Sequence, residues 1–204
     1  MLRIQMKLVL ALAKVPLVCA VFIGFCVASA SVAATEEFTA AGVLLIARQN
    51  GVPYVLLGRD RHRPWFEMLG GRRESSHRTD GEGAGRQESA YETAIRECYE
   101  ESRGYLEPEL LRRLIDPAIF IRDGDFVFFF ALVDKFPLED IIGMTTSGHE
   151  QPSRFQEIVE YAWVPVESAL AADGVNVLDE FGRRIRVRRQ LKSRLGRARG
   201  VDWF

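Results

Sequence analysis

A short segment at residues 96–104, RECYEESRG, places three glutamates beside one arginine. On a helix, Glu97 is three residues from Glu100 and four from Glu101, so the three carboxylates project from one side. Like charges at that spacing repel one another, and a hard divalent cation such as Mg²⁺ or Mn²⁺ would relieve the repulsion. The segment therefore predicts half of a metal site, with substrate phosphates completing the metal's shell. The alternative is a solvated helix face on which Arg96 pairs with glutamates four residues away.

The flanking sequence indicates the helix that carries these glutamates. Ser89 is a good N-cap and Glu92 stands three residues later, which is the arrangement of a capping box. Apolar residues then recur at helical spacing, at Tyr91, Ala94, Ile95 and Cys98. Gly104 is a natural stop. We therefore expect the carboxylates on a helix between Ser89 and Gly104, next to its buried stripe.

The spacing of the charged residues extends backwards from the helix. Glu88 stands seven residues before Arg96, so the segment is E-x7-R-E-C-x-E-E. This pattern resembles the catalytic box of the Nudix hydrolase family, G-x5-E-x7-R-E-U-x-E-E-x-G-U, in which U is aliphatic. The matching positions are Glu88, Arg96, Glu97, Cys98, Glu100 and Glu101. An apolar hairpin before the box and WVPVESAL after it also look like that fold, so the resemblance covers roughly residues 38–170.

The resemblance implies a mixed-sheet α/β/α sandwich and a hydrolase that cleaves a pyrophosphate bond in nucleoside diphosphate-linked substrates by attack of water. It implies that Glu97, Glu100 and Glu101 are ligands of Mg²⁺ or Mn²⁺, one of them serving as the base. Arg96 would orient Glu97, and Glu88 would support the cluster. The alternatives are a module that binds phosphorylated ligand or nucleic acid without turnover, and a membrane-tethered interaction protein. The glutamates favour the enzyme, because a binding module has no need to cluster like charges.

Two glycines of the family's box are displaced in this chain. Glu82 stands where the opening glycine is expected. The counterpart is Gly71, moved away by an insertion of about eleven residues in a polar loop at residues 72–87. The resemblance then assigns the Gly71 carbonyl to the metal. Arg103 stands where the closing glycine is expected, with Gly104 next, which predicts a helix end displaced by one residue.

Four charged residues outside the box are further candidates. Members of the family often take another carboxylate from the loop before the last strand, and Glu157 and Glu160 in FQEIVEYAW have that position. Glu160 is also a candidate for contacting substrate. Arg59 and Arg61, in GRDRHRPW, could bind substrate phosphates. The simpler alternatives are a surface acid at a strand start and a polar loop.

The rest of the pattern predicts one mixed α/β domain at residues 38–200. Apolar runs predict strands at residues 41–47, 53–58, 65–69, 125–133 and 159–166. Asn50 and Gly51 between the first two runs predict a hairpin turn. Helices are expected from Pro108, over ESALAA and over residues 178–195. In the last of these, Phe181, Ile185 and Leu195 would be the apolar contacts.

Residues 1–34 are predicted to be a targeting segment. A positive start, an apolar stretch at residues 15–27 and small residues at 28–30 indicate a signal peptide and a secreted or periplasmic protein. An uncleaved membrane anchor is the second interpretation, because the apolar run approaches the ~20 residues that span a membrane. The third is a cytoplasmic protein, if the segment is not translated. Cleavage would leave Cys98 as the only cysteine, so we expect no internal disulfide.

Charge is unevenly distributed along the 204 residues, although the formal net charge is −1. The segment from Arg183 to Phe204 carries nine basic residues and one acid. Such a tail could hold nucleic acid or an anionic membrane surface. The preferred interpretation is the solvated side of a basic C-terminal helix. The expected partner is therefore a small nucleotide or other diphosphate substrate. Membrane contact is expected only if residues 1–34 stay uncleaved. Binding of nucleic acid by the basic tail is not favoured.

Overall fold

The structure is a computed structural model that describes residues 37–74, 87–144, 153–171 and 175–198. The predicted targeting segment, residues 1–34, and most of the predicted polar loop lie outside these ranges. Within them, no helix is both long enough and apolar enough to cross a membrane.

Strands and helices alternate along the described chain. In order, the elements are β1 (Ala40–Gln49), β2 (Val52–Asp60), β3 (Phe66–Glu67), β4 (Leu69–Arg72), α2 (Ala90–Glu101), α3 (Pro108–Leu114), β5 (Phe120–Asp123), β6 (Phe126–Val133), α4 (Leu138–Gly143), the 3₁₀ turn η3 (Ser153–Gln156), β7 (Ile158–Pro165), α5 (Val166–Ala171), β8 (Asn176–Leu178), β9 (Arg184–Arg186) and α6 (Gln190–Ala198).

A seven-stranded mixed sheet forms the centre of the fold. The strand order is β3-β2-β1-β6-β5, with β4 paired to β1 and β7 paired to β2. β1 and β6 run parallel, and the other pairs in this sheet are antiparallel. Every residue from Ala41 to Ala47 on β1 is buried, because both faces of the sheet are covered. The predicted mixed α/β fold with a central mixed sheet and helices is confirmed.

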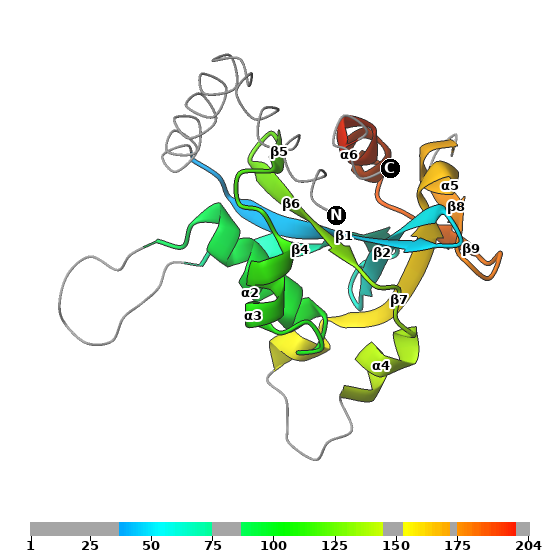
Figure 1. The fold of residues 1–204 in the computed structure, drawn as a ribbon, viewed down its shortest axis with the longest axis horizontal. Helices are drawn as coiled ribbons and strands as arrows, with labels where there is room; N and C mark the ends of the chain where they lie inside the picture. The colour runs from blue at the N-terminus through cyan, green and yellow to red at the C-terminus, as the bar shows by residue number, and fades with distance from the viewer. Residues whose placement is uncertain (1–36, 75–86, 145–152, 172–174, 199–204) are drawn as a thin grey trace, which may run out of the picture. The chain divides into compact units, whose positions relative to one another are not determined.

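Side chains alternate between the two faces of the sheet and build two apolar clusters. Val43 and Leu45 on β1 belong to the cluster that includes Ala94 and Cys98 of α2. Leu44 and Ile46, between them in sequence, belong to the cluster that includes residues of α5 and α6. Figure 1 shows α2 and α3 on one side of the sheet and α6 on the other. The glutamate-bearing helix thus packs on one defined face.

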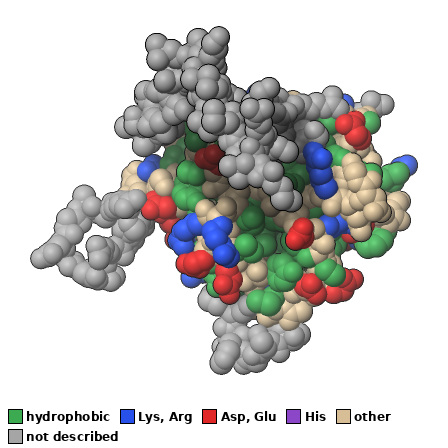
Figure 2. Space-filling model, viewed as in Figure 1, with side chains coloured by type: hydrophobic (Ala, Val, Ile, Leu, Met, Phe, Trp, Pro, Cys, Tyr) green, Lys and Arg blue, Asp and Glu red, His purple; other side chains and the backbone are tan. Residues whose placement is uncertain are grey.

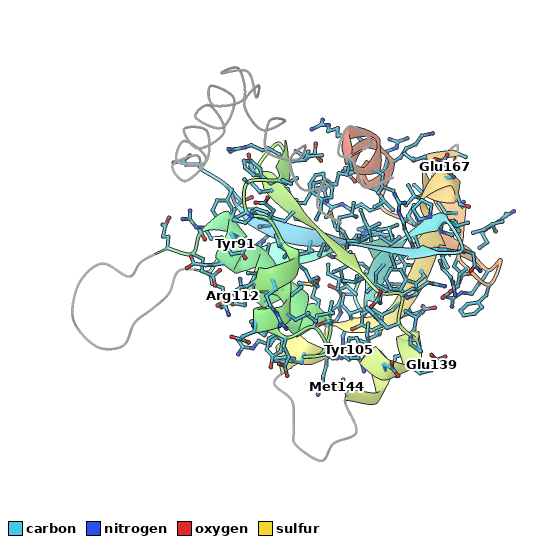
Figure 3. All side chains as sticks on the ribbon, viewed as in Figure 1. Tyr91, Tyr105, Arg112, Glu139, Met144 and Glu167 are labelled. Atoms are coloured by element: carbon cyan, nitrogen blue, oxygen red, sulfur yellow. The ribbon has the colours of Figure 1, made fainter. Side chains whose placement is uncertain are left out.

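The predicted hairpin and the predicted start of α2 are both present. Asn50 and Gly51 have φ of 52° and 78°, the left-handed values that a tight β1–β2 turn requires. Ser89 accepts a hydrogen bond from the backbone N–H of Glu92, whose carboxylate accepts one from the backbone N–H of Ser89. Beside this turn the Tyr91 hydroxyl donates to the Arg112 carbonyl of α3 at 3.4 Å (Figure 3). Local sequence signals therefore fix where α2 begins.

The prediction of one last helix over residues 178–195 is wrong. The segment forms the β8–β9 hairpin, and α6 begins only at Gln190. The Asp179 carboxylate accepts hydrogen bonds from the backbone N–H groups of Phe181 and Arg183, which holds the chain in a turn. Ile185 is buried as predicted, whereas Phe181 is 78% exposed.

The prediction of a displaced end for α2 is also wrong. The Arg103 N–H donates to the Glu100 carbonyl at 3.0 Å, and the Gly104 N–H donates to the Tyr99 carbonyl at 2.8 Å. These two bonds define a Schellman motif, whose left-handed residue is Arg103 with φ of 55°. Arginine itself therefore holds the position at which the closing glycine was expected.

Charges of both signs are interspersed on the described part of one face of the molecule. On the visible described part of the face in Figure 2, basic and acidic side chains alternate with apolar ones. That part of the surface therefore carries no broad patch of one charge.

Candidate metal and active site

Two glycines of β4 lie directly against α2. The Gly70 N–H donates to Oε2 of Glu101 at 2.5 Å. A Cβ atom on Gly71 would overlap the carboxylate of Glu97, so a larger residue there would push that carboxylate aside. β4 is held in place by antiparallel pairing with the first half of β1. The sheet and the helix thus bring the Gly71 backbone, Glu97 and Glu101 together, as the sequence analysis expected.

Arg96 is the centre of a network of carboxylates. Its Nε donates to Glu88 at 2.8 Å, and its Nη1 donates to Glu97 at 2.8 Å and to Glu100 at 3.3 Å. Its Nη2 donates to the Arg72 carbonyl at 2.8 Å. Burial alone would lower the pKa of Arg96, but Glu88 and Glu97 raise it overall. The Arg96–Glu100 pair of the alternative interpretation exists, yet the arginine side chain is only 18% exposed, so this is not a solvated face.

Glu88 supports Arg96 from the residue before the N-cap of α2. Its carboxylate also accepts hydrogen bonds from the Thr93 hydroxyl and from the backbone N–H of Glu74. Burial acts to raise the pKa of Glu88, but the hydrogen bonds and the charge of Arg96 outweigh it and lower that pKa. Glu88 is therefore a charged partner that holds the guanidinium in place.

The pKa values of Glu97, Glu100 and Glu101 on α2 are shifted in the opposite direction. Burial raises the pKa of Glu97 to about 7 against the pull of Arg96, and the charge of Glu100 adds to the increase. Burial also raises the pKa of Glu100 and raises that of Glu101 well above its usual value. The charge of Glu97 raises the pKa of Glu101 further. The cluster thus carries more acid than its nearby cations neutralise.

The two candidate carboxylates near β7 lie in different places. Glu157, exposed at the start of β7, is close enough to raise the pKa of both Glu97 and Glu101 through its charge. Successive side chains of β7 lie on opposite faces of the sheet, and Glu160 lies on the face away from α2. There it pairs with Arg59 at 2.9 Å and with Arg183. Glu157 joins the α2 cluster, and Glu160 belongs to the other face of the sheet.

The candidate arginines differ in the same way. Arg59 is held by Glu160 on the face away from α2. The backbone N–H of Arg61 donates to the Glu157 carbonyl at 3.0 Å, and its Nη2 donates to the Gln156 carbonyl at 2.5 Å. Arg61 therefore lies beside the residues just before β7.

Sequence reasoning missed two residues that contact the cluster. Arg154 of η3 forms an ion pair with Oε1 of Glu100 at 3.1 Å, and its side chain is 53% exposed. The Tyr161 hydroxyl of β7 donates to the Glu101 carbonyl at 2.5 Å. Both residues are more than fifty positions from α2 in the sequence, and no motif marks either one.

The donor set fits a hard divalent cation. Across the described ranges, no three His, Cys, Asp or Glu side chains converge on a single point. Arg96, Arg154 and the Gly70 N–H are instead the partners of the carboxylates of Glu97, Glu100 and Glu101. The donors are oxygen atoms of glutamates around a glycine cradle, which is the chemistry that Mg²⁺ and Mn²⁺ prefer. The excess of negative charge is of the kind that such an ion would neutralise.

Comparison with protein families identifies the family to which the chain belongs. A family model described as the NUDIX domain matches residues 36–185. The chain belongs to the Nudix family. Its Nudix box is the segment from Glu88 to Glu101, and the described residues place that box on α2 and on the residues just before it.

Solved structures similar to this Nudix protein include one enzyme and one domain. An Ap4A hydrolase of C. elegans, described as a binary complex, is 18% identical, with a TM-score of 0.37, 64% of this chain covered and 82% of that chain. The NUDIX domain of Shewanella oneidensis NrtR, complexed with ADP ribose, is 14% identical, with a TM-score of 0.45 and coverages of 81% and 88%. A search of curated proteins finds no significant match.

Proposed function

We propose that this Nudix protein is a divalent-cation-dependent hydrolase that cleaves a pyrophosphate bond in nucleoside diphosphate-linked substrates by attack of water. The observation that carries the proposal is the group of largely buried glutamates on α2, Glu97, Glu100 and Glu101, packed against Gly70 and Gly71 with their pKa values raised. A module that only binds phosphorylated ligands has no use for a buried excess of acid, because anionic ligands would be repelled by it.

The proposed cation is Mg²⁺ or Mn²⁺. Glu97, Glu100 and Glu101 would hold it, together with the Gly71 carbonyl and the Glu157 carboxylate. When bound, the ion supplies charge that polarises the phosphoryl group and offsets the negative charge of the leaving oxygen. Glu100 would exchange its Arg154 partner for the ion.

Arg96 and Glu97 would act on the attacking water. Arg96 holds one oxygen of Glu97, Oε1, and is itself held by Glu88. This leaves Oε2, on the side of Gly71, to accept the proton that the attacking water loses. We therefore assign Glu97 as the base, Arg96 as the residue that orients it, and Glu88 as the support of Arg96.

Substrate phosphates would meet cationic side chains next to the carboxylates. Arg61 lies beside Glu157, and Arg154 is half exposed beside Glu100. We propose that both bind phosphate oxygens, since guanidinium groups donate paired hydrogen bonds to them. Arg59 and Glu160 instead stabilise the pairing of β2 and β7 by binding each other.

Residues 1–34 remain proposed as a secretory signal peptide on the sequence pattern alone. Expression in the native host, followed by cell fractionation and N-terminal sequencing of the purified chain, tests this. A secreted or periplasmic chain that begins near residue 30 is expected. A chain that retains Met1 in the membrane fraction would instead indicate the anchor.

The proposed reaction is tested by turnover of a panel of nucleotide pyrophosphates with Mg²⁺ or Mn²⁺, and with EDTA. The panel contains nucleoside diphosphate sugars, dinucleoside polyphosphates and dinucleotide cofactors, and release of nucleoside monophosphate or phosphate is measured. We expect cation-dependent turnover that Glu101→Gln abolishes and Glu109→Gln, an exposed change on α3, leaves intact. Intact cation binding without turnover on any substrate would favour the binding module.

A further inference from the structure

The end of α2 contains a backbone conformation that its residue type does not favour. Arg103 has φ of 55° in the Schellman motif, where a residue with a Cβ is strained by about 1 kcal/mol relative to glycine. Gly104, with φ of 81°, follows directly and could not relieve this strain. A glycine at position 103 would make the same helix end without the strain, so the backbone alone does not explain the arginine.

The side chain of Arg103 connects α2 to the start of β7. Its Nη2 donates to the Ile158 carbonyl at 2.8 Å, across 55 residues of sequence. The guanidinium also lies beside the Tyr161 hydroxyl, which donates to the Glu101 carbonyl at 2.5 Å. Arg103 and Tyr161 thus tie one short stretch of β7 to the last turn of α2, the turn that carries Glu101.

Glu157 lies between two anchored points of the backbone. On one side, the Ile158 carbonyl is held by Arg103. On the other, the Gln156 carbonyl accepts a hydrogen bond from Nη2 of Arg61 at 2.5 Å. Regular β2–β7 pairing is interrupted here, because the register shifts between Arg59 and Asp60. At this irregular point of the β2–β7 ladder, the Arg103 hydrogen bond adds a restraint from α2 on the backbone next to Glu157.

We propose that Arg103 is a positioning residue, which fixes the start of β7 against α2 so that the Glu157 carboxylate faces Glu97 and Glu101. This inference rests on the proposed cation site, because Glu157 acts there as a ligand. Arginine at this position costs a small backbone strain, but its side chain fixes the distance between α2 and the start of β7, which both supply carboxylates. A purely structural helix cap would be improved by glycine, whereas a positioning residue would be damaged by it.

The test uses the full chain and the pair of variants Arg103→Gly and Arg103→Ala. Both remove the guanidinium, but only glycine removes the strain. Mn²⁺ affinity is measured by electron paramagnetic resonance, and amide hydrogen exchange is followed at residues 157–159. Glu157→Gln and its combination with each variant complete a double-mutant cycle. Arg112→Ala, on the exposed side of α3, is the control.

We expect both Arg103 variants to bind Mn²⁺ about tenfold more weakly, as is usual when an outer-shell partner of a metal ligand is lost. Exchange at the start of β7 should be faster in both, and neither should weaken binding further once Glu157 is glutamine. Thermal stability should be higher for glycine than for alanine, because strain is relieved only in glycine.

Three results would overturn the inference. The first is that the parent binds Mn²⁺ tightly and that the variants have the same Mn²⁺ affinity and the same hydrogen exchange. This result would reject the role of Arg103 but would leave the proposed function intact. The second is a loss of affinity that adds fully to that of Glu157→Gln, which means that Arg103 does not act through Glu157. The third is a parent that binds no Mn²⁺, which removes the cation site and this inference together.

Discussion

Helices α2 and α6 both place a largely buried arginine against carboxylates, but the balance of charge is opposite. On α2, Arg96 is in contact with Glu88, Glu97 and Glu100. On α6, Arg194 and Arg197 both pair with Asp123 at the end of β5. Carboxylates outnumber guanidinium groups in the α2 cluster, and guanidinium groups outnumber carboxylates in the α6 cluster. The excess acid has its pKa values raised, which supports the proposal that a cation binds at α2.

The α6 pairs are part of the packing of the domain. The Arg194 side chain is 7% exposed, its guanidinium lies 4.3 Å from the centre of the Phe126 ring, and Nη1 is 3.6 Å from the Met68 sulfur. The basic tail is therefore not simply the solvated side of a helix, because one of its charges is inside. The comparison separates a structural arginine, Arg194, from Arg96, which we propose to orient the reactive carboxylate of Glu97.

The largest effect is expected when the α2 cluster loses its proposed base. Glu97→Gln should lower kcat by about a hundredfold to ten-thousandfold, the usual contribution of a general base, with little change in KM. Steady-state kinetics with a substrate from the turnover panel measures this. Asp123→Asn, at the end of β5 where it pairs with α6, is the matched control and should leave kcat unchanged. Equal kcat in Glu97→Gln and parent would remove the assigned role.

A loss of fold stability rather than of activity is expected at α6. Arg194→Ala leaves a buried space and one fewer partner for Asp123, and should cost about 3 kcal/mol of unfolding free energy. Arg197→Ala, whose side chain is half exposed, should cost less than about 1 kcal/mol. Urea unfolding of both variants measures the difference. Similar costs for the two would mean that burial does not distinguish them.

The pH dependence of the cation effect follows from the raised pKa of Glu97. Without cation, the folded protein keeps that proton up to about pH 7, whereas the unfolded chain loses it near the usual 4.5. This contribution to stability is complete below about pH 4.5 and is lost as the pH rises through 7. A cation replaces the proton, so Mg²⁺ should raise Tm more at pH 8 than at pH 5.

Thermal unfolding with Mg²⁺ or EDTA across this pH range tests the sign, and Glu97→Gln should weaken the trend. An equal Mg²⁺ effect on Tm at pH 5 and pH 8 would contradict it.

A smaller change is expected from Arg154, the exposed partner of Glu100. Arg154→Ala should raise KM about tenfold through the lost phosphate contact, an effect of about 1.4 kcal/mol. The same change should tighten Mn²⁺ binding, because Glu100 is freed from a competing cation. Kinetics and Mn²⁺ titration together separate the two roles, and an unchanged KM would show that Arg154 does not contact substrate.

The smallest effect is expected at the start of α2. Ser89→Ala removes one side of the capping box and should cost about 1 kcal/mol of unfolding free energy. Thermal or urea unfolding measures it, with Ser193→Ala on the exposed side of α6 as the control. A cost indistinguishable from that control would mean that the cap adds no stability.

The sequence by itself determined the features that depend on near neighbours in the chain. The capping box at Ser89, the hairpin at Asn50 and Gly51, and the common side of Glu97, Glu100 and Glu101 all follow from preferred backbone angles and helical spacing. The spacing of the box also identified the family before any contact was known. These features were predictable because each involves residues that are close together in the sequence.

Only the tertiary structure decided the features that join distant segments. Glu157 rather than Glu160 lies beside α2, because a shift in the β2–β7 register changes which side chains face that helix. Arg154 and Arg103 meet their partners across more than fifty residues. The β8–β9 hairpin replaced a predicted helix because Ile185 packs into the core while Asp179 closes a turn. Strand register and long-range pairing depend on packing between elements, which local spacing does not encode.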